Sequence, residues 1–255
     1  MPREGISLYA LGRILGTIGD STLSRVAFGR SRHIHAKQGA AQTDGVAIAL
    51  LAECLLWLQD FTKASSLADR AWELAVVERY ERDLIHAAIY QGQAAIGLSD
   101  IERADERLHY ALTRARAINL VELELPNLVA IAELNIQQGN PASAKARFDD
   151  VWDAALRGPY PIYQADAYNV LADIELRERN QSAAIEAATN AYKAAWCDGP
   201  PYAYHWGLEK AKAHLQALNA PKPELPPFDE SNFEPLPDVE LNPKDKYWVD
   251  PDTLD

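Results

Sequence analysis

Small and apolar residues recur along the chain at helical spacing, and the whole pattern repeats every forty residues. In the segment 61–78 these residues fall three and four positions apart, so they share one face of an α-helix. Alanine is abundant and runs of β-branched residues are scarce, which favours helix over strand. A polar residue separates consecutive helical segments at the same phase of every repeat. This series is Asp20, Asp60, Asp100, Asn140 and Asn180.

Four further series keep the same step without an insertion. The first two, which hold mostly small residues, are Ser24, Ala64, Ala104, Ala144, Ala184 and Ser31, Ala71, Ala111, Val151, Ala191. The third, which holds three large and two small residues, is Phe28, Ala68, Leu108, Phe148, Ala188. The fourth lies eight residues before the polar position and is Gly12, Ala52, Gly92, Ala132, Ala172. Five units in phase predict a structural repeat.

Each series has a physical role in a helical hairpin. The Asp or Asn side chain is placed to accept a hydrogen bond from the free N–H groups in the first turn of the next helix. Pro141 follows Asn140 directly and suits the first helical position, where no N–H is needed. Small residues let two helix axes approach to about 8–10 Å, and the large residues fill the space that remains.

The sequence therefore predicts an all-α protein of stacked hairpins, because no single hairpin can bury its apolar face alone. In the second unit we expect helices at 45–59 and 61–78, and in the fourth at 126–138 and 141–156. The expected repeats are 5–44, 45–84, 85–124, 125–164 and 165–202, followed by a capping helix at 203–218. Together they form a helical repeat domain over residues 1–219, and residues 220–255 form an extended tail.

This order of small and large positions resembles the tetratricopeptide repeat (TPR) over about residues 5–200. The usual TPR period is ~34 residues, and a period of forty resembles TPR variants in bacterial regulatory ATPases. HEAT or armadillo-type repeats are the alternative, since their periods are also near forty. The chain departs from the pattern at Ser24, Ser31 and Gln91, which take small or apolar positions. The resemblance implies a right-handed α-solenoid.

The stretch "YHWGLEKAKAHLQAL…PELPPFD" resembles the segment that closes TPR arrays in bacterial STAND-type signalling ATPases. In those proteins the array recognises an activating ligand. This chain has no GxxxxGK[ST] motif, so the resemblance does not extend to their nucleotide-binding part.

From Pro221 onward the composition changes to proline and acidic residues. The final 35 residues hold eight of the fifteen prolines, ten Asp or Glu and three Lys, which favours an extended chain over a regular helix. Four aromatic residues distinguish this tail from a purely solvating one: Phe228, Phe233, Tyr247 and Trp248. We expect them to contact the helical array. The alternatives are docking on another protein and plain disorder.

Charge and cysteine content narrow the partners and the compartment. The 255-residue chain has a formal net charge of −12, which disfavours nucleic acid and anionic membranes as partners. No stretch approaches the ~18 apolar residues of a membrane span, and the N-terminal apolar run is broken by Gly12, Arg13 and Gly16. Cys54 and Cys197 show no zinc or disulfide spacing. We expect a cytoplasmic protein.

The sequence shows no constellation typical of catalysis. The imidazoles of His33 and His35 fall on different helix faces, and no HExxH motif or i, i+4 histidine pair occurs. There is no GxSxG, no glycine-rich phosphate loop and no GxGxxG. Cys54 lies in an apolar helix, and Cys197 lies in a loop without an adjacent base. We expect neither an enzyme nor a bound cofactor or metal.

The architecture instead predicts a binding surface. In a TPR stack the first helix of each hairpin lines the concave side, and one helical stripe faces the groove. The expected groove residues are Tyr9, Arg13, Glu53, Trp57, His86, Gln93, Glu133, Asp166, Asn169, Asp173 and Arg177. Such a groove is acidic in the middle and suits a basic or amphipathic segment of a protein or peptide partner. The alternative is that these charges only keep the inner face soluble.

These features favour a protein-interaction module: a scaffold, an adaptor or a ligand-sensing subunit in a bacterial signalling or defence complex. Two other functions stay open. One is a structural solenoid subunit that self-assembles into a homo-oligomer. The other is a domain that senses a small molecule or nucleotide.

Overall fold

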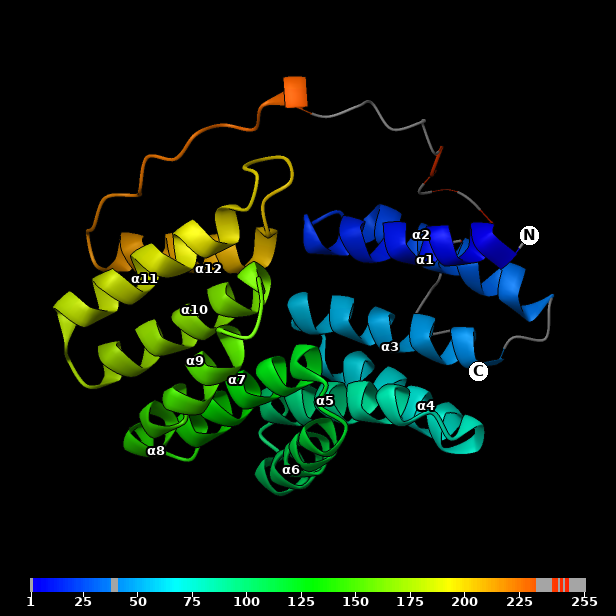
Figure 1. Cartoon of the computed structure of the whole chain (residues 1–255), viewed down its shortest axis with the longest axis horizontal. Helices are drawn as coiled ribbons and strands as arrows, with labels where there is room; N and C mark the ends of the chain where they lie inside the picture. The colour runs from blue at the N-terminus through cyan, green and yellow to red at the C-terminus, as the bar shows by residue number, and fades with distance from the viewer. Residues whose placement is uncertain (1, 38–40, 233–239, 243, 245, 248–255) are drawn as a thin grey trace. The chain divides into compact units, whose positions relative to one another are not determined.

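The computed structural model consists of α-helices joined mostly by short turns (Figure 1). It describes residues 2–37, 41–232, 240–242, 244, 246 and 247, and no strand occurs among them. The contacts divide the chain into two compact units. Unit 1 comprises residues 1–119 and 238–255, and unit 2 comprises residues 120–237. The division therefore falls after the third hairpin, inside the region 1–219 that the sequence analysis treated as one domain.

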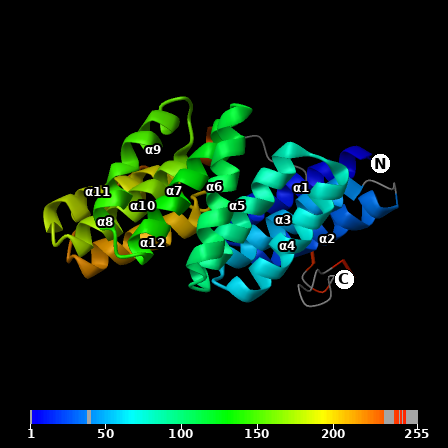
Figure 2. The ribbon, with the colours of Figure 1, turned by 90° about the horizontal axis from the view of Figure 1, so that it is seen from below.

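Unit 1 contains three helical hairpins, whose paired helices lie side by side (Figures 1 and 2). They are α1 (Pro2–Thr17) with α2 (Ser21–Ala36), α3 (Ala41–Trp57) with α4 (Phe61–Glu78), and α5 (Glu81–Gly97) with α6 (Ile101–Ala117). The expected helix at 61–78 is confirmed, and its expected partner at 45–59 begins four residues earlier and ends two residues earlier. Contacts between α2 and α3 and between α4 and α5 join successive hairpins.

Unit 2 continues the pattern with two hairpins and a closing helix. They are α7 (Val121–Gln137) with α8 (Pro141–Ala146) and α9 (Phe148–Ala155), then α10 (Pro161–Arg177) with α11 (Gln181–Trp196), then α12 (His205–Ala217). The expected start of α7 at residue 126 was wrong, because Pro126 lies inside the helix. A proline near the N-terminus removes one backbone hydrogen bond and need not end the helix.

The polar series works as predicted at four of its five positions. Asp20, Asp60, Asp100 and Asn180 each accept a hydrogen bond from the backbone N–H three residues later, at 2.9–3.4 Å. Asn140 makes no side-chain cap, although Pro141 does occupy the start of α8. These residues are the N-caps of the second helices.

The residue before each of these caps adopts a left-handed backbone conformation, which the sequence analysis did not anticipate. The series is Gly19, Gln59, Ser99, Gly139 and Arg179, with φ between 59° and 96°. In the second hairpin, the N–H of Asp60 donates to the carbonyl of Leu55 and that of Gln59 donates to Leu56. This Schellman closure ends one helix and includes Asp60, the same residue that caps the next helix.

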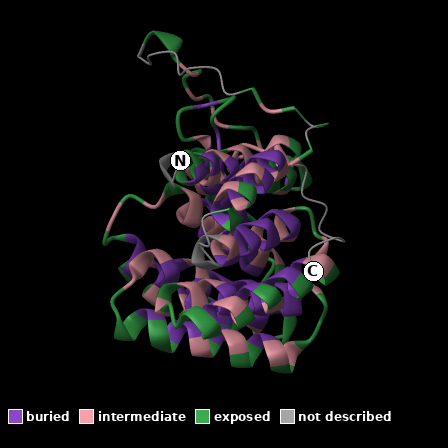
Figure 3. Ribbon diagram, turned by 90° about the vertical axis from the view of Figure 1, so that its right-hand side faces the viewer, coloured by how far each residue is buried: buried purple, intermediate pink, exposed green. Residues whose placement is uncertain are grey.

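The small positions bury the faces on which paired helices meet, as Figure 3 shows by the buried residues on facing helices. Gly12 lies against the ring of Phe28, and Gly92 lies against Leu108. Ser24 and Ser31, the two departures in the first hairpin, donate hydrogen bonds of 2.6 Å and 2.7 Å to backbone carbonyls of α1. The hydroxyls therefore have partners inside the core, which removes the cost of burying them.

The single helix expected at 141–156 was wrong, because the chain forms α8 and α9 with a break at Arg147. The break immediately precedes Phe148, which stands sixteen residues after Ala132 in the repeat pattern. The equivalent large residues Phe28 and Leu108 stand sixteen residues after glycines. We attribute the break to this difference, since the methyl group of Ala132 occupies the space that a glycine would leave for the ring.

Helix α12 behaves as the first helix of an incomplete sixth hairpin. It contacts α10 through pairs 38 residues apart, in which Tyr204 meets Asp166 and Gly207 meets Asn169. Since both residue numbers increase together, α10 and α12 run in the same direction, as the first helices of successive hairpins do. The expected capping helix at 203–218 is thus present, with a role beyond capping.

Residues 220–231, here called the strap, follow α12 where a second helix would complete the hairpin. Ala220 and Leu225 pack against the buried cluster of α10, α11 and α12. The indole N–H of Trp196 donates to the carbonyl of Pro226 at 2.8 Å, and Phe228 meets Tyr202 edge-on with ring centroids 4.7 Å apart. An extended, proline-rich segment therefore covers the end of unit 2.

Candidate functional site

In unit 2 the structure brings four predicted groove residues onto one face with α12. Glu133 comes from α7, and Asp166, Asn169 and Asp173 follow one stripe of α10. Asp173 and Glu133 keep 35% and 37% of their side chains exposed, so both carboxylates can reach a partner. Asn169 is buried and donates to the carbonyl of Gly207 at 3.0 Å, with its own side-chain oxygen left without a hydrogen bond.

Lys210 of α12 lies on this face. Its positive charge is opposite to the acidic character predicted for the middle of the groove. Its Nζ lies 3.0 Å from Oδ2 of Asp173 and 3.8 Å from Oε1 of Glu133. Burial lowers the pKa of Lys210, but the carboxylates of Glu133 and Asp173 outweigh that effect and the pKa is raised. The lysine is therefore charged at neutral pH and neutralises part of the acidic surface.

The pKa values of two groups beside Lys210, those of Glu133 and His214, are also shifted. Burial raises the pKa of Glu133, while Lys210 acts in the opposite sense. Burial lowers the pKa of His214, whose Nε2 lies 3.6 Å from Oδ1 of Asp173. His214 is therefore neutral at pH 7, and Lys210 supplies the positive charge of this cluster.

In unit 1 three predicted residues on the first helices interact. Desolvation by the surrounding protein atoms raises the pKa of the Glu53 carboxyl group. The charge of Arg13 and a hydrogen bond with Tyr90 lower this pKa by a smaller amount. Desolvation together with the charges of Arg13 and Arg82 lowers the pKa of His86 to about 3. The imidazole of His86 stacks on the ring of Tyr90 with centroids 6.0 Å apart. This is a polar cluster of mixed charge, in which the predicted cation Arg13 lies with the predicted carboxyl group of Glu53.

The other predicted groove residues do not join these clusters. Trp57 lies near Gly16 of α1. A Cβ atom added to Gly16 would be 3.1 Å from the ring of Trp57. Tyr9 and Gln93 are partly buried on α1 and α5. Arg177 is exposed in the last turn of α10.

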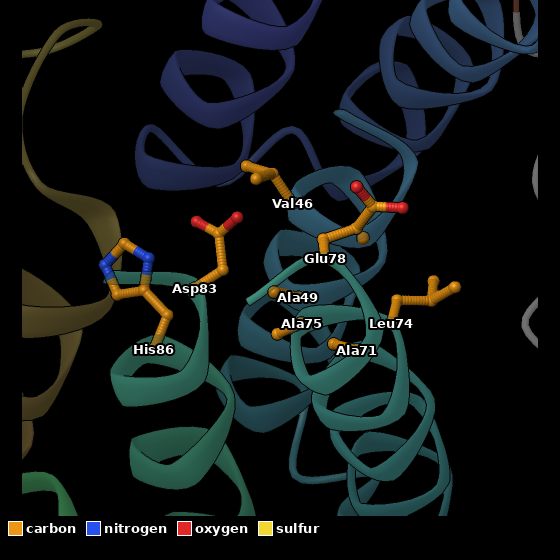
Figure 4. Close-up of a pocket in the computed structure, with 9 residues that line it drawn as sticks. Val46, Ala49, Ala71, Leu74, Ala75, Glu78, Asp83 and His86 are labelled. Atoms are coloured by element: carbon orange, nitrogen blue, oxygen red, sulfur yellow. The ribbon is translucent and has the colours of Figure 1, made fainter. Parts of the chain in front are cut away.

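A small cavity lies between α3, α4 and α5 (Figure 4). Its walls are apolar, from Val46, Ala49 and Leu74 among others, while Asp83 and His86 lie at its α5 side. Its volume of about 10 Å³ is room for about one water molecule, far less than a small-molecule ligand needs. This cavity therefore gives no support to a small-molecule function.

The tail residues fall into three groups. Phe228 lies in the strap on unit 2. Tyr247 packs on His33 of α2 in unit 1, with ring centroids 5.0 Å apart, and Arg30 donates to the carbonyl of Glu240 at 3.1 Å. Phe233 and Trp248 lie outside the described residues.

Sequence reasoning missed Lys210, Tyr204 and Tyr90. Lys210 lies on α12 and Tyr204 is the N-cap of that helix, which was treated as a cap of the array and given no groove positions. Their spacing from Asp173 and Asp166, 37 and 38 residues, is close to the repeat and was the available signal. Tyr90 was missed because it stands one position from the predicted stripe.

Membrane-spanning helices and metal-binding clusters are both absent from the described residues. No helix there is both long and apolar enough to cross a membrane. No group of three or more His, Cys, Asp or Glu side chains in the same part of the chain is arranged to hold a metal ion.

No protein-family model matches the chain, and no curated protein matches its sequence. Among solved structures, the chain is similar to the crystal structure of BtubC (BKLC) from P. vanneervenii. The two share 17% sequence identity with a TM-score of 0.51, over 89% of this chain and 99% of that chain. Similarity at this level of identity concerns the fold alone. Together with the hairpins described above, it defines an all-α helical repeat protein.

Proposed function

We propose that this protein is a protein-interaction module of the TPR type, which holds a basic or amphipathic segment of a partner against the first helices of its hairpins. The observation that supports the proposal is the position of the Lys210 side chain. An ammonium group of the chain itself lies between Asp173 and Glu133. This face of unit 2, formed by α7, α10 and α12, thus already accommodates an ammonium group, the kind of cation that a lysine of a partner would bring.

The charge balance of this face leaves room for a second cation. Three carboxylates, those of Glu133, Asp166 and Asp173, act on the ammonium of Lys210. The hydroxyl of Tyr204 donates to Asp166 at 3.1 Å, which orients that carboxylate without neutralising it. A lysine or arginine side chain from a partner would therefore meet three carboxylates on an ordered surface.

Unit 1 offers a different set of contacts on its own first helices. Arg13, Glu53 and His86 provide a cation, a carboxyl group and a neutral imidazole, beside the aromatic ring of Tyr90. Such a mixture suits recognition of a peptide with both polar and apolar side chains. The role of each unit is to bind, as a scaffold, an adaptor or a ligand-sensing part of a signalling complex, and it needs no catalytic step.

The test uses the full chain and a set of fluorescent peptides that share one apolar pattern and carry either lysine or glutamate at the polar positions. We expect the lysine peptides to bind more tightly and to weaken with added salt. The double variant Glu133→Gln with Asp173→Asn should lose at least about tenfold in affinity, as expected for removal of charged contacts.

The matched control is Asp153→Asn with Glu186→Gln, which removes the same charge from exposed positions of α9 and α11. It should keep the wild-type affinity. Lys210→Met should tighten binding of the lysine peptides, because the internal competitor is removed. Equal loss in both double variants would mean that only net charge matters, and the proposal would be wrong.

A further inference from the structure

The outer face of α4 carries exposed features at both of its ends. α4 packs against α3 and α5, and its opposite side is open along the stripe Thr62, Ser66, Asp69, Glu73 and Val76. Val76 and Val77 in its last turns are 50% and 75% exposed, and Tyr80, which precedes α5, is 48% exposed. This apolar tip is more than the scattered single residues that a surface normally shows.

The N-terminal half of the same face is hollow. A depression of about 500 Å³ is lined by Thr62, Ser65, Ser66, Asp69 and the exposed side chain of Leu98 among others. Leu58, which is 40% exposed, lies at the same end of the helix. The hollow is lined mainly by polar side chains, with the exposed Leu98 as its apolar part, whereas the tip at the other end is apolar.

Two residues that line the hollow, Ser65 and Asp69, take part in a hydrogen-bond network with α5 and α6. The side-chain N–H of Gln91, a residue that is only 2% exposed, donates to Oδ1 of Asp69 at 2.6 Å. Arg103 of α6 pairs with the same carboxylate and donates to Oγ of Ser65 at 3.3 Å. Gln91, which departs from the repeat pattern, therefore orients Asp69 through this hydrogen bond. The side chain of Asp69 remains 43% exposed.

Charges of both signs stand at the centre of the face. Asp69, Arg70 and Glu73 are adjacent on the helix surface, and Arg70 and Glu73 keep 45% and 66% of their side chains exposed. Arg70 Nη1 lies 3.2 Å from Glu73 Oε2, a surface pair of the kind that contributes little to stability. Both groups are thus available to a partner at small cost.

We propose that α4 is a self-association surface, on which two copies of the chain pair with their α4 helices antiparallel about a two-fold axis. An axis near the pair 69–70 places Arg70 of each copy opposite Asp69 of the other and beside Glu73. It also places the Val76–Val77 tip of each copy over the hollow of the other. The partner is a second copy because the α4 face itself carries both members of each proposed contact. These are Asp69 and Arg70 for the ion pair, and the hollow and the Val76–Val77 tip for the packing contact. Antiparallel pairing about a two-fold axis brings each contact together twice.

The first test is sedimentation equilibrium of the full chain up to about 1 mM, because a small interface binds weakly. We expect a reversible monomer–dimer equilibrium. Arg70→Glu and Val77→Asp should each raise the dimer dissociation constant by about tenfold or more, through like-charge contact and loss of apolar contact. Leu156→Asp is the control, since Leu156 is 86% exposed in unit 2. A strict monomer, or an equal effect of all three variants, would overturn the proposal.

The second test fixes the register. Two chains, both carrying Cys197→Ser, would bear Thr62→Cys or Val77→Cys and be mixed with a short bis-maleimide. The proposed antiparallel pairing brings residue 62 of one copy beside residue 77 of the other, so the mixed pair should cross-link. Thermal unfolding by circular dichroism confirms that each variant is folded. A dimer that forms without this cross-link uses another face, and the assignment to α4 would then be wrong.

Discussion

A Cβ atom on Gly92 would lie 2.5 Å from Cδ2 of Leu108, closer than two carbon atoms can approach. The two residues face one another across the hairpin of α5 and α6. Gly92 and its counterpart Gly12, which lies against Phe28 in the same way, are therefore required by the size of the residue opposite each of them. In these two hairpins the glycine leaves the space that the large residue of the second helix fills.

We expect Gly92→Ala to destabilise unit 1 by about 1–3 kcal/mol, the usual cost of overpacking a core. The control is Gly45→Ala in α3, where the nearest atom, Cβ of Leu74, lies 3.4 Å from the added methyl group. That change should be neutral or stabilising, because alanine favours helix by about 1 kcal/mol over glycine. Urea unfolding measures both, and an equal effect would contradict the packing argument.

The left-handed residue before each N-cap gives a prediction of opposite sign. Ser99 has φ of 61°, a conformation that costs a residue with a side chain about 1–2 kcal/mol. Ser99→Gly should therefore stabilise the protein by about 0.5–1 kcal/mol, after the greater entropy of glycine in the unfolded chain is counted. Ser66→Gly at an exposed position inside α4 should destabilise it instead. Finding the same sign for both would refute the assignment of strain to the turn.

Acid stability should depend on His86. The folded state lowers the pKa of His86 from 6.5 to about 3, so below pH 6.5 the unfolded chain takes up a proton that the folded chain does not. This contribution to stability is fully present above pH 6.5 and is lost as the pH falls towards 3, with a slope of at most about 1.4 kcal/mol per pH unit.

His86→Gln should reduce that slope in denaturant unfolding measured from pH 7 to pH 4. The companion variant is His109→Gln, which removes an imidazole exposed on α6. The two variants should differ in slope. If His86→Gln keeps the wild-type slope, protonation of His86 does not limit acid stability.

The two cysteines should react very differently. Burial raises the pKa of the Cys54 thiol to about 12, and its Sγ lies 3.5 Å from Oγ of Ser24 inside the core. Cys197 is exposed, although partial burial raises its pKa too. A thiol reagent should therefore label one site in the native protein, slowly at neutral pH, and both sites in denaturant. Cys197→Ser should abolish native labelling. Fast labelling of Cys54 would mean that α1, α2 and α3 open readily.

The sequence predicted the hairpins because each depends on local chemistry: an acceptor for free N–H groups at Asp60 and small residues where helices meet. It did not reveal the break at Arg147, which we attribute to a relation between Phe148 and Ala132 on two different helices. The left-handed turn residues were missed because Gln59, Ser99 and Arg179 are not glycines, so the turn geometry overrides their intrinsic preference.

The candidate site was predictable only in part. The positions of Asp166 and Asp173 followed from the repeat, and the structure does place them on one stripe. Lys210 could not be found by the same rule as long as α12 was treated as a terminal cap. Its effect on Asp173 is a contact between helices that are separated along the chain by all of α11, which no local pattern encodes.

The strap has a consequence for how long such an array can be. Where the next helix would begin, the chain carries Pro221, Pro223, Pro226 and Pro227, and these residues supply no N–H to a helix. Growth of the array by gene duplication must therefore insert whole forty-residue modules ahead of α12. An engineer who lengthens this protein has the same entry point, and should leave residues 203–231 together as an interchangeable C-terminal end piece.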